Sequence, residues 1–184
     1  MARTHEALDE TLRSFIAEQP LFFVASAPDG PGGHVNLSPK GLDSFRVIDD
    51  HTVAYLDLTG SGVETIAHLC QNGRLSIMFC AFTGPPRIVR LYGHGQVHLA
   101  GSDRFEELGP HFPALVGARS IITCDLDRIQ SSCGYAVPLM ELAEQRSTLI
   151  DWAERRGPDG LADYWAEKNE TSIDGLPGHP GGTP

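Results

Sequence analysis

The stretch from Asp57 to Gly93 constrains the fold of this chain more than any other. It reads as the end of a strand, a Gly-Ser-Gly turn, a short helix, a strand, a tight turn and a second strand. The turn, Thr59–Gly62, would place backbone N–H groups of a helix amino-terminus where glycines allow an anion to approach. The stretch is therefore a candidate wall of an anion site, and the rest of the chain must supply the positive charge.

Polar and apolar residues alternate along two further segments. In residues 34–40, one face carries His34, Asn36, Ser38 and Lys40, and the other carries Val35 and Leu37. In residues 87–100, one face carries Arg90, Tyr92, His94, Gln96 and His98. Alternation with a period of two predicts strands. A polar face is either a solvated outer surface or the wall of a binding site, and a single strand leaves both open.

The whole pattern predicts a mainly β fold with flanking helices. Strands are expected at residues 21–27, 34–40, 52–58, 74–82, 87–100 and 118–126. Helices are expected at residues 4–18, 61–72, 102–108, 139–156 and 159–168. Six strands with hairpin-like connections favour an antiparallel barrel with helices packed outside. A doubly wound parallel sheet is disfavoured because only one crossover contains a helix.

The 184 residues suggest one domain. We expect it to span residues 1–173 and to include C-terminal helices within 139–168. Residues 174–184 are rich in glycine and proline, so this tail is expected to be disordered.

Charge and composition exclude several classes of partner. The chain carries 24 acidic and 14 basic residues, a net charge of −10, without a basic block. Binding to nucleic acid or to an anionic membrane surface is therefore not expected. No apolar run is long enough to span a membrane, and the first residues resemble an amphipathic helix rather than a signal peptide. The four cysteines form no Cys-x-x-Cys pair, so we expect a cytoplasmic protein without a zinc site.

The Gly-Ser-Gly turn has two explanations. Ser61 and Glu64 have the spacing of a capping box, which alone would account for these residues. The alternative is a phosphate site in which Lys40 and Arg90 join Ser61 and Thr65 at the mouth of the barrel. Arg90 could instead pair with one of the many acidic residues.

No acid–base or nucleophile pattern stands out, so the catalytic residues are unassigned. His94 and His98 share a strand face but lack a third ligand at a suitable spacing, and no metal site is predicted. No Gly-x-Ser-x-Gly elbow appears. Chemistry carried by a cofactor fits this absence.

The order of elements resembles the pyridoxamine 5'-phosphate oxidase-like FMN-binding split-barrel proteins. The resemblance rests on the segments HVNLSPKG, VAYLDLTGSGVETIAHLCQNGR, LSIMFCAF and the long strand that ends RLYGHGQV, within residues 20–127. The segment SSCGYAVP at 131–138 and the closing KNETSIDGLPG look like those of one uncharacterised subgroup. The members of this family often carry an Arg-Lys pair after the turn, where this chain has Gly62 and Val63, so oxidation of vitamin B6 is not expected.

The resemblance implies a six-stranded split barrel that forms a homodimer with FMN at each subunit interface. It implies an FMN-dependent oxidoreductase that transfers hydride through flavin N5 to or from a small-molecule substrate of unknown identity. A non-catalytic protein that binds a flavin, a deazaflavin or haem is the alternative. The implied FMN contacts are Asn36, Leu37, Ser38, Lys40, Asp57, Thr59, Gly60, Ser61, Gly62, Thr65 and Arg90.

Overall fold

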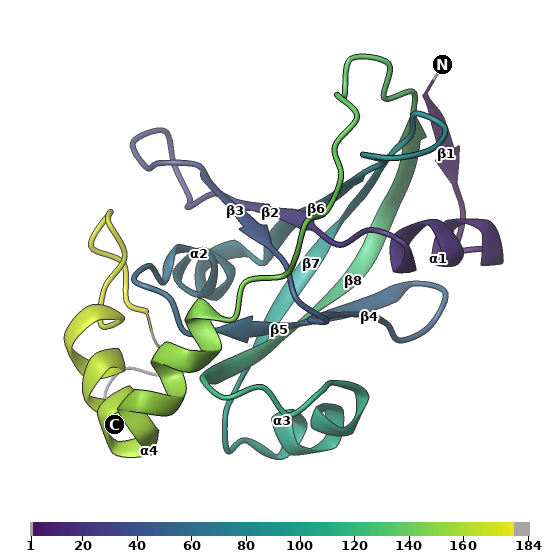
Figure 1. The fold of residues 1–184 in the computed structure, drawn as a ribbon. Coiled ribbons are helices and arrows are strands. Elements are labelled where there is room, and N and C mark those ends of the chain that lie inside the picture. Colours follow the sequence, from purple (N-terminus) through teal and green to yellow (C-terminus); the bar gives the residue numbers. More distant parts are fainter. Residues whose placement is uncertain (1, 179–184) are drawn as a thin grey trace.

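The computed structural model describes residues 2–178, which form a strongly curled antiparallel sheet with helices around it (Figure 1). The strand order is β3-β2-β6-β7-β8-β5-β4, and β1 pairs with β8 outside this path. The strands are β1 Arg3–His5, β2 Phe22–Ser26, β3 Asn36–Lys40, β4 Phe45–Val47, β5 Thr52–Leu58, β6 Arg74–Cys80, β7 Ile88–Leu99 and β8 Ala118–Ser132. The helices are α1 Glu10–Ala17, α2 Glu64–Asn72, α3 Asp103–Leu108 and α4 Thr148–Lys168, with a 3-10 turn at Gly109–His111.

The predicted fold class, an antiparallel split barrel with flanking helices, is confirmed, but the strand count of six is wrong. The two additional strands, β1 and β4, have three residues each and are too short to show an alternating pattern. β1 also occupies part of the segment predicted as a helix over residues 4–18. The helix itself starts later, where Asp9 caps α1 by accepting a hydrogen bond from the backbone N–H of Leu12 at 2.8 Å.

The concave side of the sheet encloses the main core. Phe22 of β2, Tyr55 of β5 and Phe79 of β6 are almost completely buried. The centre of the Phe22 ring lies 5.8 Å from that of Tyr55 and 5.6 Å from that of Phe79. α1 inserts Leu12, Phe15 and Ile16 into this core, and α2 inserts Ile66 and Leu69. A smaller cluster lies under α3 and includes Leu108, Phe112, Ala54, Leu56 and Ile121.

β3 presents its polar side to the protein and its apolar side to solvent. The side chains of Asn36, Ser38 and Lys40 line a cleft inside the split barrel. Val35 and Leu37 point the other way and are 73% and 63% exposed. The polar face of this strand is therefore an interior wall and not a solvated outer surface.

The predicted capping box at the start of α2 is wrong. α2 begins at Glu64 after Val63, which makes no side-chain capping bond. The Glu64 carboxylate instead accepts a hydrogen bond from the backbone N–H of Ile173 at 3.3 Å. The carbonyl oxygen of Ser61 accepts one from the Asn169 side chain at 3.4 Å. The residues of the turn thus bind the C-terminal segment rather than each other.

The C-terminal segment differs from its prediction at two places. Residues 139–147 belong to no helix or strand, and the first helical residue is Thr148. All nine residues are exposed, so the segment has no buried face to stabilise a helix, and the Met140 N–H donates to the carbonyl of Phe82. The one helix, α4, bends at Gly157, where the backbone is not helical.

The tail predicted to be disordered is partly ordered. Thr171 pairs with Pro177, and the Gly178 N–H donates to the carbonyl of Glu170. Residues 179–184 lie outside the described part of the chain. Within residues 2–178, no helix combines the length and apolar character needed to cross a membrane.

Candidate functional site

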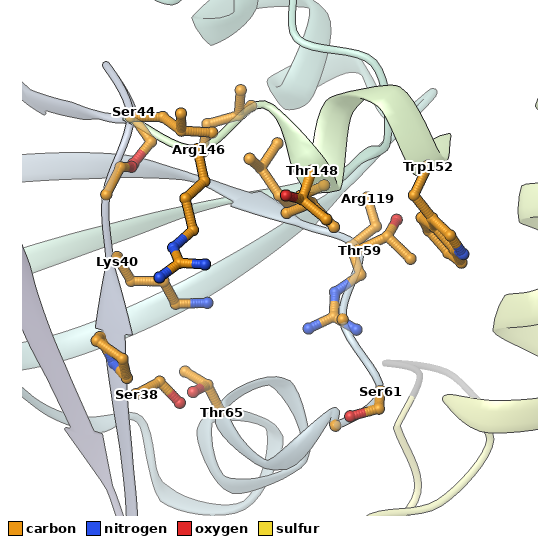
Figure 2. A pocket seen from close by; sticks show the side chains of 18 of the residues that line it. Ser38, Lys40, Ser44, Thr59, Ser61, Thr65, Arg119, Arg146, Thr148 and Trp152 are labelled. Carbon is orange, nitrogen blue, oxygen red and sulfur yellow. The ribbon is translucent and has the colours of Figure 1, made fainter. Parts of the chain in front are cut away.

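A cleft of about 930 Å³ opens between β3, the end of β5, the Thr59–Gly62 turn and the start of α4. Figure 2 shows Ser38 and Lys40 on one side, Ser61 and Thr65 below, Arg119 in the middle, and Trp152 on the far side. The cleft lies where the two edges of the curled sheet fail to meet, because β3 and β4 end the strand order. It has the size of a site for a small molecule or cofactor.

Two cations in the cleft share one buried carboxylate. Nζ of Lys40 lies 2.8 Å from Oδ1 of Asp57, and Nε of Arg119 lies 2.7 Å from Oδ2. Asp57 is 1% exposed, whereas Lys40 and Arg119 remain 20% and 10% exposed. Burial acts to raise the pKa of Asp57, but Lys40 and Arg119 outweigh it and hold this pKa at about 2. The group therefore carries one net positive charge, presented to the cleft.

Hydrogen bonds to Gly117 and to the C-terminal part of the chain hold the Thr59–Gly62 turn in place. The Thr59 hydroxyl donates to the carbonyl of Gly117 at 2.7 Å and accepts from Nε1 of Trp165 at 2.8 Å. The Asn169 side chain donates to the carbonyl of Gly60 at 3.1 Å and accepts from Arg119 at 2.8 Å. Because these bonds come from α4 and its C-terminal end, the C-terminal segment fixes both the turn and one of the two cations.

The Asn36 side chain belongs to a buried network. Its Nδ2 donates to Oγ1 of Thr65 at 2.9 Å and to Oγ of Ser26 at 3.4 Å, and its Oδ1 accepts from Ser38 at 3.1 Å. Ser26 in turn lies 3.0 Å from Nδ1 of His68, which is fully buried. Burial lowers the pKa of His68, which keeps the imidazole neutral. Asn36 thus positions the hydroxyls of Thr65 and Ser38. The Thr65 hydroxyl accepts from Asn36, so its proton can face a ligand, whereas Ser38 donates its proton to Asn36.

The structure brings most of the predicted cofactor contacts together. Eight of them line the cleft: Asn36, Ser38, Lys40, Thr59, Gly60, Ser61, Gly62 and Thr65. Asp57 lies directly beneath it, bonded to Lys40. The side chain of Leu37 points away to solvent. Whether these residues bind a cofactor stays a prediction.

Arg90 does not line the cleft, contrary to the prediction that it converges with Lys40. Val89 and Leu91 are fully buried in the core, so the alternation of β7 turns Arg90 to the outer face of the sheet. There it donates to Oγ of Ser132 at 3.2 Å. The arginine that shares Asp57 with Lys40 in the cleft is Arg119.

The lining residues that were not predicted include three arginines and a tryptophan: Arg119, Arg146, Trp152 and Arg155. Arg119 is the second residue of β8. β8 pairs with β5, and Asp57 of β5 lies opposite Ser120, the residue after Arg119. This pairing brings Arg119 to Asp57. The other three come from the segment around the start of α4. No sequence signal connects this segment to β3, although a Trp and two Arg within ten residues could have suggested a surface for an aromatic anion.

The structure shows no metal site within the described residues, since no group of three or more His, Cys, Asp or Glu side chains converges there. His94 and His98 lie on β7 outside the cleft. The ring of His98 lies 2.9 Å from the Thr123 hydroxyl, and burial lowers the pKa of this histidine.

Comparison with known proteins identifies the family. The sequence model described as pyridoxamine 5'-phosphate oxidase matches residues 8–133. The "pyridoxamine 5'-phosphate oxidase family protein ustO" of Aspergillus flavus is 41% identical over 195 aligned residues, which cover 95% of this chain and 76% of that protein. The chain belongs to the pyridoxamine 5'-phosphate oxidase family. The family match ends at residue 133, so Arg146, Trp152 and Arg155 lie beyond the region that defines this family.

Solved structures agree with this assignment at the level of the fold. HupZ of Group A Streptococcus matches with a TM-score of 0.53 and 21% identity. The match covers 68% of the present chain and 99% of HupZ. A Lactobacillus delbrueckii protein named for the same oxidase has a TM-score of 0.53 and 15% identity, covering 69% of this chain and 98% of that one. These relationships show the shared split-barrel architecture.

Proposed function

We propose that this protein is an FMN-dependent oxidoreductase of the pyridoxamine 5'-phosphate oxidase family. The observation that carries the proposal is the pair of cations, Lys40 and Arg119, that one buried Asp57 holds beside the Thr59–Gly62 turn. A net positive charge at a glycine-containing turn before a helix suits a phosphate group. The whole chain carries a net charge of −10, so the positive charge of this group contrasts with the overall charge.

The groups that remain free fit a phosphate. Lys40 has three N–H donors and donates one of them to Asp57. Arg119 donates from Nε to Asp57 and from Nη1 to Asn169. Two Lys40 donors and Nη2 of Arg119 stay available, together with the hydroxyls of Ser61 and Thr65. α2 begins without a side-chain cap, so its first N–H groups add to the donor set.

The wall made by β3 suits the isoalloxazine ring. β3 pairs only with β2 among the described strands, so the backbone groups on its other edge are free to orient a ligand. A flavin bound there would supply reversible hydride transfer at N5. The protein's part would be to hold the phosphate, align the ring against β3 and exclude water with α4.

A flavin or deazaflavin carrier without catalysis is the second candidate. The observation that favours it is the lining of the cleft: among the described residues it contains no His, Cys or Tyr. A carrier needs no acid–base group, whereas an oxidoreductase that used one would have to take it from Lys40, Glu64 or Glu144. The same absence disfavours haem, which requires an axial ligand.

We propose that the protein functions as a homodimer in the cytoplasm. Burial against a second copy would stabilise the exposed apolar side chains at β3 and before α4. These are Val35, just before β3, Leu37 of β3, and Tyr135, Leu139, Met140 and Leu142 before α4. All four cysteines are free thiols, as in a reducing compartment. Sedimentation at several concentrations tests the dimer, and cell fractionation tests the location.

A spectrum and a turnover assay test the flavin proposal. The purified protein, alone and after incubation with FMN, should show flavin absorption that stays with it through gel filtration. A folded protein that remains colourless would reject both candidates. Oxidation of NAD(P)H, or reduction of a quinone or dye by the reduced protein, would favour the oxidoreductase. Stable flavin binding without any turnover would favour the carrier.

A further inference from the structure

The cleft has a second side that the FMN proposal does not use. The phosphate and ring are assigned to Lys40, Arg119 and β3, yet the cavity extends to α4 with a volume of about 930 Å³. That value lies near the upper end of the range of about 300–1,000 Å³ for small-molecule sites. We call this part the α4 side and define it by Thr148, Trp152 and Arg155 of α4. Arg146, which precedes α4, extends toward Lys40 in Figure 2. Figure 2 shows Trp152 beyond Arg119 and Thr59, opposite Lys40.

The α4 end of the cleft carries an excess of positive charge. Arg146 and Arg155 line the cleft and form no ion pair with any acidic side chain among residues 2–178. The lining also contains two acidic residues: Glu64 is directed to the backbone of Ile173, and Glu144 forms no ion pair with a described residue. Two unpaired guanidinium groups beside one unpaired carboxylate leave a positive excess, which suits an anionic ligand.

Trp152 supplies a rigid aromatic surface beside these charges. The guanidinium of Arg156 lies 5.0 Å from the centre of its ring, and the ring of Tyr164 meets it edge-on at 5.0 Å. Arg156 also lies 4.9 Å from the centre of the Tyr164 ring, so the three side chains form one packed unit across the bend at Gly157. A ring held in this way loses little conformational freedom when a ligand stacks on it.

We propose that the α4 side is a second subsite, which binds a purine nucleotide by stacking the base on Trp152 and pairing its phosphate with Arg146 and Arg155. The proposal rests on the flavin function, because the first subsite takes the riboflavin phosphate. The nucleotide can come from two sources. It is either the adenylyl half of FAD, joined to the flavin, or a separate adenine nucleotide, including that of a nicotinamide dinucleotide donor.

Comparing FMN, FAD and AMP tests the subsite. We expect FAD to bind the apoprotein about tenfold or more tightly than FMN if the adenylyl half is joined to the flavin. If the nucleotide is separate, FAD and FMN bind alike and AMP binds the FMN-loaded protein, with quenching of Trp152 fluorescence. Trp152→Ala and Arg155→Ala should each lower the FAD preference, or the AMP affinity, by about fivefold or more while FMN affinity is unchanged.

Two controls match these variants. Arg104→Ala removes the same charge from α3, where Arg104 pairs with Glu107 away from the cleft. Arg74→Ala removes a second exposed guanidinium, which pairs with Asp29 outside the cleft. Both should bind all three ligands as the wild type does. If Trp152→Ala does not fold, as judged by circular dichroism, Arg155→Ala decides, because its side chain is exposed and unpaired within the described chain.

The outcomes separate the subsite from the flavin proposal. Equal FAD and FMN affinities without AMP binding would overturn the subsite, as would a FAD preference that both variants retain. A folded protein that binds AMP through Trp152 but never binds FMN would reject the flavin function and leave the nucleotide subsite standing.

Discussion

The ammonium group of Lys40 lies 2.8 Å from Oδ1 of Asp57, a carboxylate that is almost completely buried beneath the cleft. Arg119 binds the other oxygen at 2.7 Å. One acidic side chain thus positions two cations from two different strands, β3 and β8. The following predictions start from this arrangement.

Acid should weaken the fold through Asp57. Its pKa in the folded protein, about 2, lies below the ordinary value of 3.8 for an aspartic acid side chain, so the ionised form stabilises the fold at neutral pH. This contribution, about 2 kcal/mol, is fully present above pH ~4 and is lost as the pH falls toward ~2. Urea unfolding from pH 5 downward measures it. Asp57→Asn should be less stable at neutral pH and should lose less stability in this range. An equally steep decline in Asp57→Asn would assign the effect to other carboxyl groups.

Lys40→Ala should weaken FMN binding by about 1.5–3 kcal/mol, since a charged hydrogen bond to the phosphate would be lost. Isothermal titration of the apoprotein measures the affinity. Lys168→Ala is the control, because Lys168 is exposed and pairs with Glu167 outside the cleft. Arg90→Ala should leave the affinity unchanged if the cleft is complete within one subunit. A loss as large as that of Lys40→Ala would place the Arg90 of a second subunit at the flavin.

Asn169→Ala should loosen the turn that faces the ligand. The side chain is 7% exposed and bonds Gly60, Ser61 and Arg119, so its removal should cost about 1–3 kcal/mol of unfolding free energy. FMN affinity should fall as well, because Arg119 loses a positioning contact. Glu170→Ala, next to it and exposed, should change neither quantity. Stability and affinity both equal to the wild type in Asn169→Ala would show that the turn is rigid by itself.

Gly93→Ala should be among the most damaging small substitutions in the sheet. A Cβ at this position would lie 2.0 Å from the carbonyl oxygen of Asp125, at the bulge where β7 and β8 shift register. Forcing the strands apart should cost about 1–3 kcal/mol or more, measurable by thermal or urea unfolding. Gly32→Ala meets no atom within 4 Å and should be neutral. Equal stability of the two variants would mean that the strands separate at little cost.

Local patterns predicted most of the sheet because its strands alternate over five or more residues. They failed where an element is short, as in β4, and where a helix needs packing that the chain does not provide, as in residues 139–147. In both cases tertiary contacts decide the structure, and propensity alone gives no signal.

The site was predictable on the β3 side but not on the side of β8 and α4. Lys40 and Ser38 stand out through alternation within one strand. Arg119 stands at the edge of an apolar run, and its partner Asp57 is 62 residues earlier in the chain. Arg90 misled the prediction because a polar strand face does not reveal whether it faces a cleft or the outside of a sheet. The capping-box pattern misled it because Ser61 and Glu64 bind a segment more than one hundred residues away.

The long-range contacts of the turn also set an order of assembly. Gly60 and Asn169 are 109 residues apart in the chain, yet their hydrogen bond helps to shape the ligand wall. During synthesis, at about 5–20 residues per second, the sheet strands emerge well before Asn169 does. The barrel can therefore form while its turn still lacks support, and ligand affinity should appear as a late step of maturation, after the sheet is already in place.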